Sequence, residues 1–151
     1  MKNTDKKTII IGIGNNGRQD DGLGWALMDY LETLDLNLDI EYRYQLQIED
    51  AELMSQYDQV IFVDATKDET ITSFSFDKCE GSEAYSFSTH ALMPETVMFL
   101  CNNVYKKYPE AHILAIKGYE WELQIGLTPK GEVNLEKAKN YFKETIVNTY
   151  L

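Results

Sequence analysis

Short blocks of apolar residues alternate along the chain with segments in which apolar residues recur every three or four positions. The blocks are rich in β-branched residues and nearly uninterrupted, which is typical of strands buried on both faces of a sheet. The other segments have the spacing that places apolar side chains on one face of a helix. We expect buried strands at residues 8–12, 59–64 and 111–117.

Weaker patterns complete the alternation of strands and helices. Residues 38–44 predict a second strand and residues 70–76 an edge strand, whereas residues 78–90 and 121–127 lack a regular period. Pro94 stands where the first turn of a helix tolerates proline. Helices are predicted from Asp21 or Gly22 to Leu31, and over residues 51–57, 94–108 and 135–150.

This order of elements predicts one α/β domain spanning residues 1–151. Strands that alternate with helices form a sheet with helices on both faces, joined by right-handed crossovers. We therefore expect a three-layer sandwich with a mostly parallel, mixed central sheet of about five strands. No repeat or low-complexity linker divides the chain.

The charge balance narrows the classes of partner. With 25 acidic and 14 basic residues the formal net charge is −11. Binding to nucleic acid depends on Lys and Arg side chains that neutralise phosphates, so we expect no nucleic-acid partner. An anionic membrane surface is disfavoured for the same reason, and no stretch has the apolar length of a membrane-spanning helix.

Cysteine use and the first residues favour a soluble, cytoplasmic protein. Cys79 and Cys101 are far apart and form no C-x-x-C motif, so they predict neither a zinc knuckle nor a redox pair. Two isolated thiols suit a reducing compartment. The apolar run after the basic residues 1–7 is too short for a signal peptide and is interrupted by glycines.

The first predicted strand runs into a glycine-rich loop that ends in two carboxylates. Gly12, Gly14 and Gly17 match the G-x-G-x-x-G fingerprint of a dinucleotide-binding turn, and Asp20 and Asp21 follow. In that fingerprint a helix begins close to the third glycine and points its amides at the diphosphate, but here the helical pattern begins several residues later. Two carboxylates would also repel a diphosphate.

A dinucleotide site therefore remains a minor alternative, with Asp39 or Glu41 as the acid that would bind the ribose. The loop is better suited to presenting its own carboxylates than to binding a diphosphate.

Three potential metal ligands stand at or just past the ends of different elements. Asp21 follows the glycine loop, Asp64 closes the strand at residues 59–64, and His90 ends the loop after the edge strand. In an open α/β sheet the ligand site lies beyond the carboxyl ends of the strands. Two carboxylates and an imidazole can bind a divalent first-row metal and leave positions open for substrate.

Each of these residues also has a purely structural interpretation. An Asp at a helix start is usually a cap or turn former, and this is our interpretation of Asp20. A lone loop histidine such as His90 is more often solvated than a ligand. Asp64 is harder to explain in this way, because a carboxylate that closes a buried strand must be solvated, paired or bound to metal.

At this point the residues resemble the hydrogenase maturation endopeptidases. The resemblance lies in residues 12–15 and 20–24, in the strand that ends at Asp64, in His90 before a helix, and in residues 125–129 before the last helix. It covers nearly the whole chain in order. Members of this family trim a C-terminal peptide from the nickel-containing large subunit of nickel–iron hydrogenase.

The resemblance implies an α/β sandwich and a nickel-dependent cut made after metal insertion. The family's metal-binding positions match Asp21, Asp64 and His90, and the nickel is supplied by the precursor, so no organic cofactor is expected. It implies a hydrogenase large-subunit precursor as the partner and a monomer that docks transiently.

The mechanism expected from the residues is hydrolysis by metal and carboxylates. Asp21, Asp64 and His90 are the candidate catalytic residues, because a carboxylate not fully committed to a metal can act as general base. Cys79 and Cys101 have only two histidines to partner them, so no nucleophile constellation is convincing. Which carboxylate is ligand and which is base stays open.

Four further residues are candidates for substrate binding: Gly12, Gly14, Asn15 and Tyr119. The glycines would let the backbone approach a substrate or simply make a tight turn, and Asn15 would fix the loop by side-chain-to-backbone hydrogen bonds. Tyr119 and Trp121 would line a peptide groove or belong to the core. A non-catalytic checkpoint module that binds the nickel-loaded partner is the alternative function.

Overall fold

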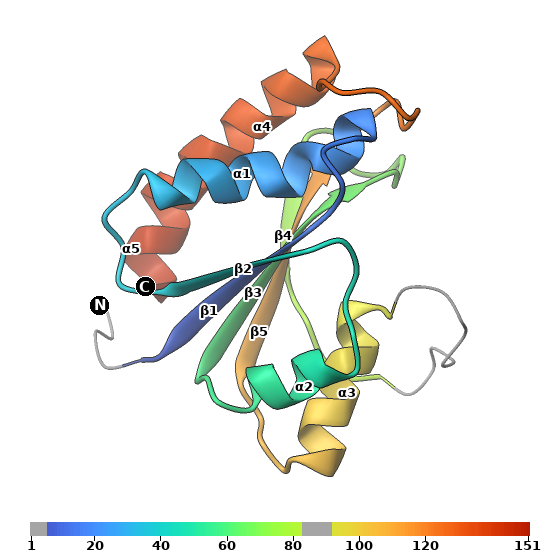
Figure 1. Ribbon diagram of the computed structural model, residues 1–151. Helices are drawn as coiled ribbons and strands as arrows, with labels where there is room; N and C mark the ends of the chain where they lie inside the picture. Colours follow the sequence, from blue (N-terminus) through green and yellow to red (C-terminus); the bar gives the residue numbers. More distant parts are fainter. Residues whose placement is uncertain (1–5, 83–91) are drawn as a thin grey trace.

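The computed structural model describes residues 6–82 and 92–151, and it has a central sheet with helices on both faces (Figure 1). The strands are β1 (Thr8–Ile13), β2 (Asp39–Arg43), β3 (Gln59–Thr66), β4 (Phe74–Lys78) and β5 (Glu110–Lys117). The helices are α1 (Leu23–Glu32), α2 (Glu49–Met54), α3 (Pro94–Val104), α4 (Pro129–Tyr141) and α5 (Val147–Tyr150), with a 3₁₀ turn η1 (Gln19–Gly22) and a π-helical turn η2 (Phe142–Ile146).

The sheet has the strand order β2-β1-β3-β5-β4. The first four strands in that order are parallel, and β4 runs antiparallel to β5 at the edge. The chain turns one way from β1 to β2 and the other way from β3 to β5, so the strand order reverses between β1 and β3. The predicted α/β sandwich with a mostly parallel, mixed sheet is confirmed.

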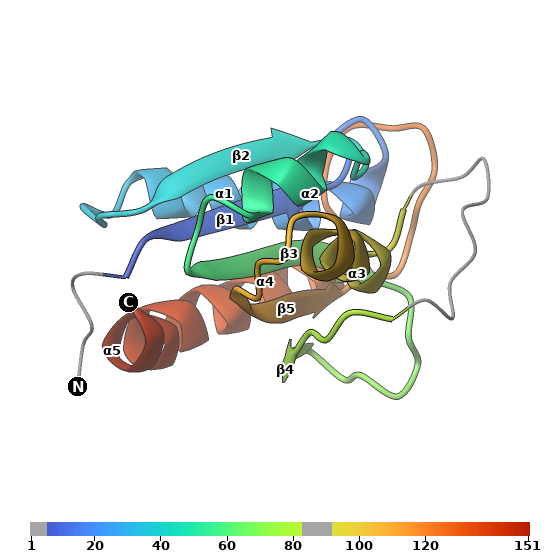
Figure 2. The ribbon, with the colours of Figure 1, turned by 90° about the horizontal axis from the view of Figure 1, so that it is seen from below.

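The helices form two outer layers (Figures 1 and 2). Helices α1 and α4 pack together on one face of the sheet, and α2 and α3 pack together on the other. Successive residues of β1 point to opposite faces. Ile10 therefore belongs to the core beneath α1 and α4, whereas Ile9 and Ile11 belong to the core beneath α2 and α3. Their complete burial explains the uninterrupted apolar run in the sequence.

The last helix begins earlier than its apolar pattern predicts. Residues 135–150 were expected, but α4 begins at Pro129 because Thr128 caps it. The hydroxyl oxygen of Thr128 accepts a hydrogen bond from the backbone N–H of Gly131 at 3.0 Å, and proline suits the first helical position. Capping chemistry, rather than apolar spacing, sets this boundary.

Two other boundaries also differ from the prediction. Helix α3 ends at Val104 rather than near residue 108, because Lys106 takes a left-handed conformation with φ 55°. The edge strand occupies Phe74–Lys78 rather than residues 70–76. Its start is delayed by a turn in which the Asp68 carboxylate accepts hydrogen bonds from both the N–H and the hydroxyl of Thr70. In the described ranges, no helix combines the length and apolar character needed to cross a membrane.

Candidate active site

The carboxyl ends of β1 and β3 meet at the point where the strand order reverses. The loop after β1 leads into η1, which bears Asp21, and Asp64 lies near the end of β3. Both carboxylates line one open cavity of about 340 Å³, together with Arg18, Ala65, Lys67 and Trp121. The structure thus brings together two of the three residues expected from the ends of predicted elements, at the place where open α/β sheets bind ligands.

Hydrogen bonds within the glycine loop hold Asp21 in place. The backbone N–H of Asn15 donates to the carbonyl of Asp21 at 3.0 Å, and the side-chain oxygen of Asn15 accepts from the N–H of Gly17 at 2.8 Å. A Cβ atom at Gly14 would lie 2.2 Å from the carbonyl oxygen of Asp21. Glycine is therefore needed at position 14 so that the loop can close on η1. The side-chain-to-backbone bond expected for Asn15 is present.

Gly24 lets α1 sit directly on the strand ends. A Cβ atom there would lie 2.7 Å from the carbonyl oxygen of Ile13 and 2.9 Å from that of Val63. The first turn of α1 thus lies against the ends of both β1 and β3, the strands that lead to Asp21 and contain Asp64.

The first carboxylate of the Asp20-Asp21 pair is structural. Asp20 is completely buried, and its oxygens accept hydrogen bonds from the N–H of Tyr119 at 2.8 Å and from the N–H and hydroxyl of Thr128 at 2.8 and 2.7 Å. A longer bond of 3.4 Å comes from the N–H of Glu120. Asp20 therefore ties the turn before α1 to the loop after β5 and to the start of α4. Its role is structural, but it is not the local cap or turn former expected from the sequence, because the partners of its side chain come from distant parts of the chain.

Burial makes the Asp64 carboxylate a stronger proton acceptor than an ordinary aspartate. Burial and, less strongly, the negative charge of Asp21 raise the pKa of Asp64 to about 7, although the backbone N–H of Ala65 donates to it at 2.8 Å and opposes the rise. The pKa of Asp21 is raised by burial, while the positive charges of Arg18 and Lys67 act against that rise. The two carboxylates therefore differ in their surroundings, which is a common arrangement in active sites.

Two cations lie in the same cavity without neutralising the acids in direct ion pairs. Among the described residues, neither Arg18 nor Lys67 has its charged nitrogen within 4.0 Å of a carboxylate oxygen. The Lys67 ammonium instead lies 5.1 Å from the centre of the Trp121 ring. The ring in turn packs against Gly118, where a Cβ atom would lie 2.9 Å from it.

The carboxylates of the cavity would supply part of the ligand set of a metal site. Asp21 and Asp64 supply two hard oxygen ligands to one cavity. Within the described ranges no three His, Cys, Asp or Glu side chains are grouped so as to hold a metal ion. His90, the third ligand expected from the sequence, lies outside the described residues.

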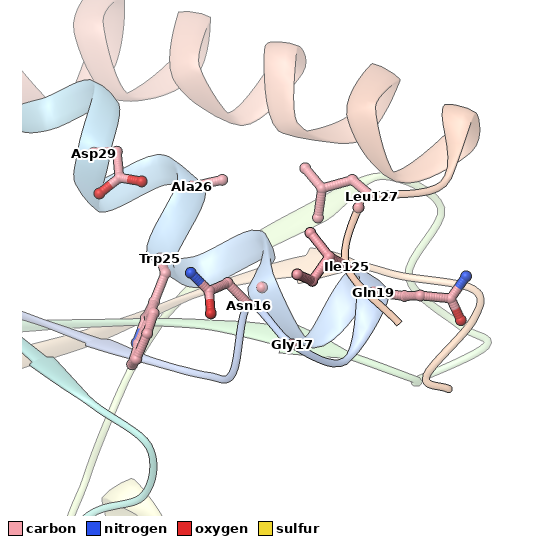
Figure 3. Close-up of a pocket in the computed structure, with 10 residues that line it drawn as sticks. Asn16, Gly17, Gln19, Trp25, Ala26, Asp29, Ile125 and Leu127 are labelled. Carbon is pink, nitrogen blue, oxygen red and sulfur yellow. The ribbon is translucent and has the colours of Figure 1, made fainter. Parts of the chain in front are cut away.

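A second hollow lies beside η1 and is shown in Figure 3. Its volume is about 260 Å³, and it separates the start of α1 from the loop before α4. The side chains of Trp25, Ala26, Ile125 and Leu127 give it apolar walls. Ile125 is 85% exposed, so its apolar side chain is available to a partner. Because η1 contributes residues to both hollows, they are neighbours on the surface.

Two of the predicted substrate-binding residues, Gly12 and Tyr119, make contacts inside the protein instead of lining the cavities. A Cβ atom at Gly12 would collide with the Met28 side chain. Tyr119 lines neither hollow, and its hydroxyl oxygen accepts a hydrogen bond from the Asn134 amide at 3.0 Å. A role for Gly12, Gly14, Asn15 or Tyr119 in binding substrate stays a prediction.

Sequence reasoning missed the two cations of the cavity. Arg18 stands between the glycine loop and Asp20, and Lys67 follows the end of β3 by one residue. Lys67 could have been found from its place just beyond a strand end, where the ligand-binding edge begins. Trp121 was considered for a groove, and it does line the cavity.

Comparison with known proteins supports the fold. No model of a protein family matches the chain, and no curated protein matches it in sequence. Among solved structures, the hydrogenase maturating endopeptidase HybD from E. coli is 19% identical over 95% of this chain and 94% of its own, with a TM-score of 0.76.

Two archaeal structures are similar to the chain as well. The [NiFe] hydrogenase maturation protease HycI from Thermococcus kodakarensis is 19% identical over 92% of this chain and 91% of its own, with a TM-score of 0.72. The hydrogenase 2 maturation peptidase from a Thaumarchaeota archaeon is 19% identical over 94% and 99%, with a TM-score of 0.68. The resemblance expected from the motifs is confirmed in three dimensions: the chain has the fold of the hydrogenase maturation endopeptidases.

Proposed function

We propose that this protein is an endopeptidase that removes the C-terminal peptide of a nickel-loaded nickel–iron hydrogenase large-subunit precursor. The observation that carries the proposal is the meeting of Asp21 and Asp64 in one open cavity at the reversal point of the sheet. Three solved structures with this fold are themselves described as hydrogenase maturation peptidases or endopeptidases. We expect the protein to act as a cytoplasmic monomer that docks on its substrate transiently.

The nickel belongs to the substrate in this proposal. Asp21 and His90 would hold the precursor's nickel from the protease side, and Asp64, the third ligand expected from the sequence, would be left free enough of the metal to accept a proton. A bound divalent metal polarises a carbonyl or lowers the pKa of bound water. The contribution of this chain is to orient the scissile peptide beside the two carboxylates.

We assign the general base to Asp64. A base works best when its pKa lies near the working pH, and burial places the pKa of Asp64 at about 7. Asp64 takes a proton from the attacking water and returns it to the leaving nitrogen. The peptide bond is thereby replaced by a carboxylate and an ammonium group, and one water is consumed.

The apolar hollow beside η1 gives the substrate chain a place next to the cut. Its walls of Trp25, Ile125 and Leu127 suit an apolar side chain of the precursor. Leu123 lies in the same loop before α4 as Ile125, and its side chain, which is 77% exposed, offers the precursor a further apolar contact.

The direct test is mass spectrometry of a nickel-loaded large-subunit precursor incubated with wild-type protein, Asp21→Asn or Asp35→Asn. Asp35 is an exposed aspartate beyond the far end of α1 and is the matched control. We expect wild type and Asp35→Asn to release a C-terminal peptide and Asp21→Asn to leave the precursor intact.

Other outcomes separate the alternatives. Intact precursor that still co-elutes with wild-type protein would favour a checkpoint module that binds without cutting. Cleavage by Asp21→Asn at the wild-type rate would remove Asp21 from the chemistry. If the wild-type protein neither binds nor cleaves any hydrogenase precursor, the proposed function is wrong.

A further inference from the structure

We propose that Lys67 stabilises the negative charge that develops on the oxygen of the scissile carbonyl during hydrolysis. The inference rests on the proposed function and adds a catalytic group to it. Its basis is the arrangement of the cavity, in which a cation that forms no ion pair with any described carboxylate lies beside the two candidate catalytic carboxylates.

The backbone of Lys67 is anchored at the end of β3. Its carbonyl oxygen accepts a hydrogen bond from the Lys117 ammonium at 2.8 Å, and the same ammonium donates to the carbonyl of Asp68 at 3.1 Å. The next residue of the partner strand is fixed too, since the N–H of Gly118 donates to the carbonyl of Thr66 at 3.0 Å. The side chain of Lys67 thus starts from a fixed position just beyond the end of the strand that contains Asp64.

The Trp121 ring restrains the charged end of Lys67. The ammonium lies 5.1 Å from the ring centre, within the range of a cation–π contact. Such a contact uses the positive charge but leaves the N–H groups of the ammonium available as donors. The ring is itself backed by Gly118, so it forms a firm wall of the cavity.

Among the described residues no carboxylate lies within 4.0 Å of the Lys67 ammonium, so its donors are not consumed by an ion pair. Arg18 lines the same cavity, but no contact comparable to that with Trp121 holds its side chain among the described residues. A group that is already oriented stabilises a transition state without further reorganisation. For this reason Lys67, rather than Arg18, is assigned to the oxyanion.

The chemical step balances with the groups named. Water adds to the carbonyl carbon and passes a proton to Asp64, while the carbonyl electron pair becomes a negative charge on oxygen that faces the Lys67 ammonium. Collapse of this intermediate breaks the C–N bond, and the nitrogen leaves with the proton from Asp64. Lys67 keeps its proton throughout and acts only by charge and hydrogen bonding.

The test compares wild type with Lys67→Met, Lys67→Arg and Lys130→Met in single-turnover cleavage of the nickel-loaded precursor, with the affinity of the complex measured by calorimetry. Lys130, in the first turn of α4, lines neither hollow and is the matched control. We expect Lys67→Met to lower kcat by about 10²- to 10³-fold with affinity changed less than about threefold. Lys67→Arg should recover part of the rate, and Lys130→Met should retain it.

A purely electrostatic role through Asp21 gives a different result. In that case Lys67→Met would weaken binding of the nickel-loaded precursor by about the same factor as it lowers kcat, and the assignment would be wrong. A normal kcat in Lys67→Met at every pH would also overturn it while leaving the proposed function intact. Failure of the wild-type protein to cut any precursor would overturn the proposed function and this assignment together.

Discussion

Adjacent aspartates in the same turn have opposite tasks. Asp20 is buried and fully used by backbone and hydroxyl donors, whereas Asp21 is partly exposed in the cavity. The two side chains have different surroundings: the carboxylate of Asp20 accepts hydrogen bonds from Thr128, whereas Asp21 lines the same cavity as Asp64. A dipeptide of identical residues therefore contains one structural and one candidate functional group.

Replacing Asp20 by Asn should destabilise the protein. An amide nitrogen would face N–H groups of Tyr119 and Glu120 that now donate to Asp20, so we expect a loss of about 2–4 kcal/mol in the free energy of unfolding. Urea denaturation would measure it. Asp21→Asn is the matched control and should unfold at or above the wild-type midpoint, and equal losses in both variants would contradict this division of tasks.

Replacing Asp64 by Asn should stabilise the metal-free protein at pH 8. A carboxyl whose pKa rises to about 7 on folding costs no stability below its ordinary pKa near 4; the cost grows as the pH rises from about 4 to 7 and is complete above 7. We expect Asp64→Asn to gain about 2–4 kcal/mol at pH 8. Denaturation in the presence of a chelator would measure the gain.

The pH dependence supplies the control for this prediction. As the pH falls to 4 and below, the Asp64 carboxyl becomes protonated in the unfolded state as well as in the folded state, so the advantage of Asn should shrink towards zero. A gain that is the same at both pH values would show that ionisation of Asp64 is not its cause.

At the scale of elements, the site depends on how closely α1 approaches the ends of β1 and β3. Gly24 makes that approach possible, because two carbonyl oxygens occupy the space that a side chain would need. The glycine also lies in the motif that suggested the family, where the sequence alone gave it no specific task.

Gly24→Ala should therefore destabilise the protein, although alanine is the better helix former. An unhindered change of this kind gains about 0.5–1 kcal/mol, whereas contacts of 2.7 and 2.9 Å to Ile13 and Val63 should turn the gain into a loss of about 1–3 kcal/mol. Thermal unfolding would decide the sign. A higher melting temperature for the variant would mean that α1 can move without cost.

At the scale of the whole molecule, His112 joins the sheet to the end of the chain. Its ring stacks on Phe76 of β4 with centroids 4.7 Å apart and meets the Tyr150 ring edge-on at 4.8 Å. Burial lowers the pKa of His112, with Glu110 opposing and Lys78 and Lys6 reinforcing that change. The neutral imidazole is thus part of the contact between β5 and α5.

Acid should weaken this contact. Since the folded state disfavours protonated His112, its contribution to stability is complete above about pH 6.5 and is lost as the pH falls below that value. In urea denaturation, the stability of His112→Phe should improve relative to wild type between pH 7 and pH 5. Parallel curves for the two proteins would contradict the prediction.

Much of the molecule followed from local pattern. The uninterrupted apolar runs determined the buried strands, because a strand covered by helices on both faces has no solvent-facing side. The alternation of strands with helices determined the sandwich, and Asp64 was identified because a carboxylate that closes such a run requires a partner. The boundaries at Thr128, Lys106 and Asp68 were missed, because capping and turn chemistry set them rather than apolar spacing.

What the sequence by itself determined was therefore the class of fold, the edge of the sheet where a site would lie, and two carboxylates at that edge. Only the tertiary structure decided which aspartate of the pair is buried, that Asp21 meets Asp64, and that Lys67 joins them over the Trp121 ring. The physical reason is that burial and strand periodicity are properties of neighbouring residues, whereas these contacts connect β1, β3 and the loop after β5. Their geometry depends on strand order and on the close approach of α1, which no local pattern encodes.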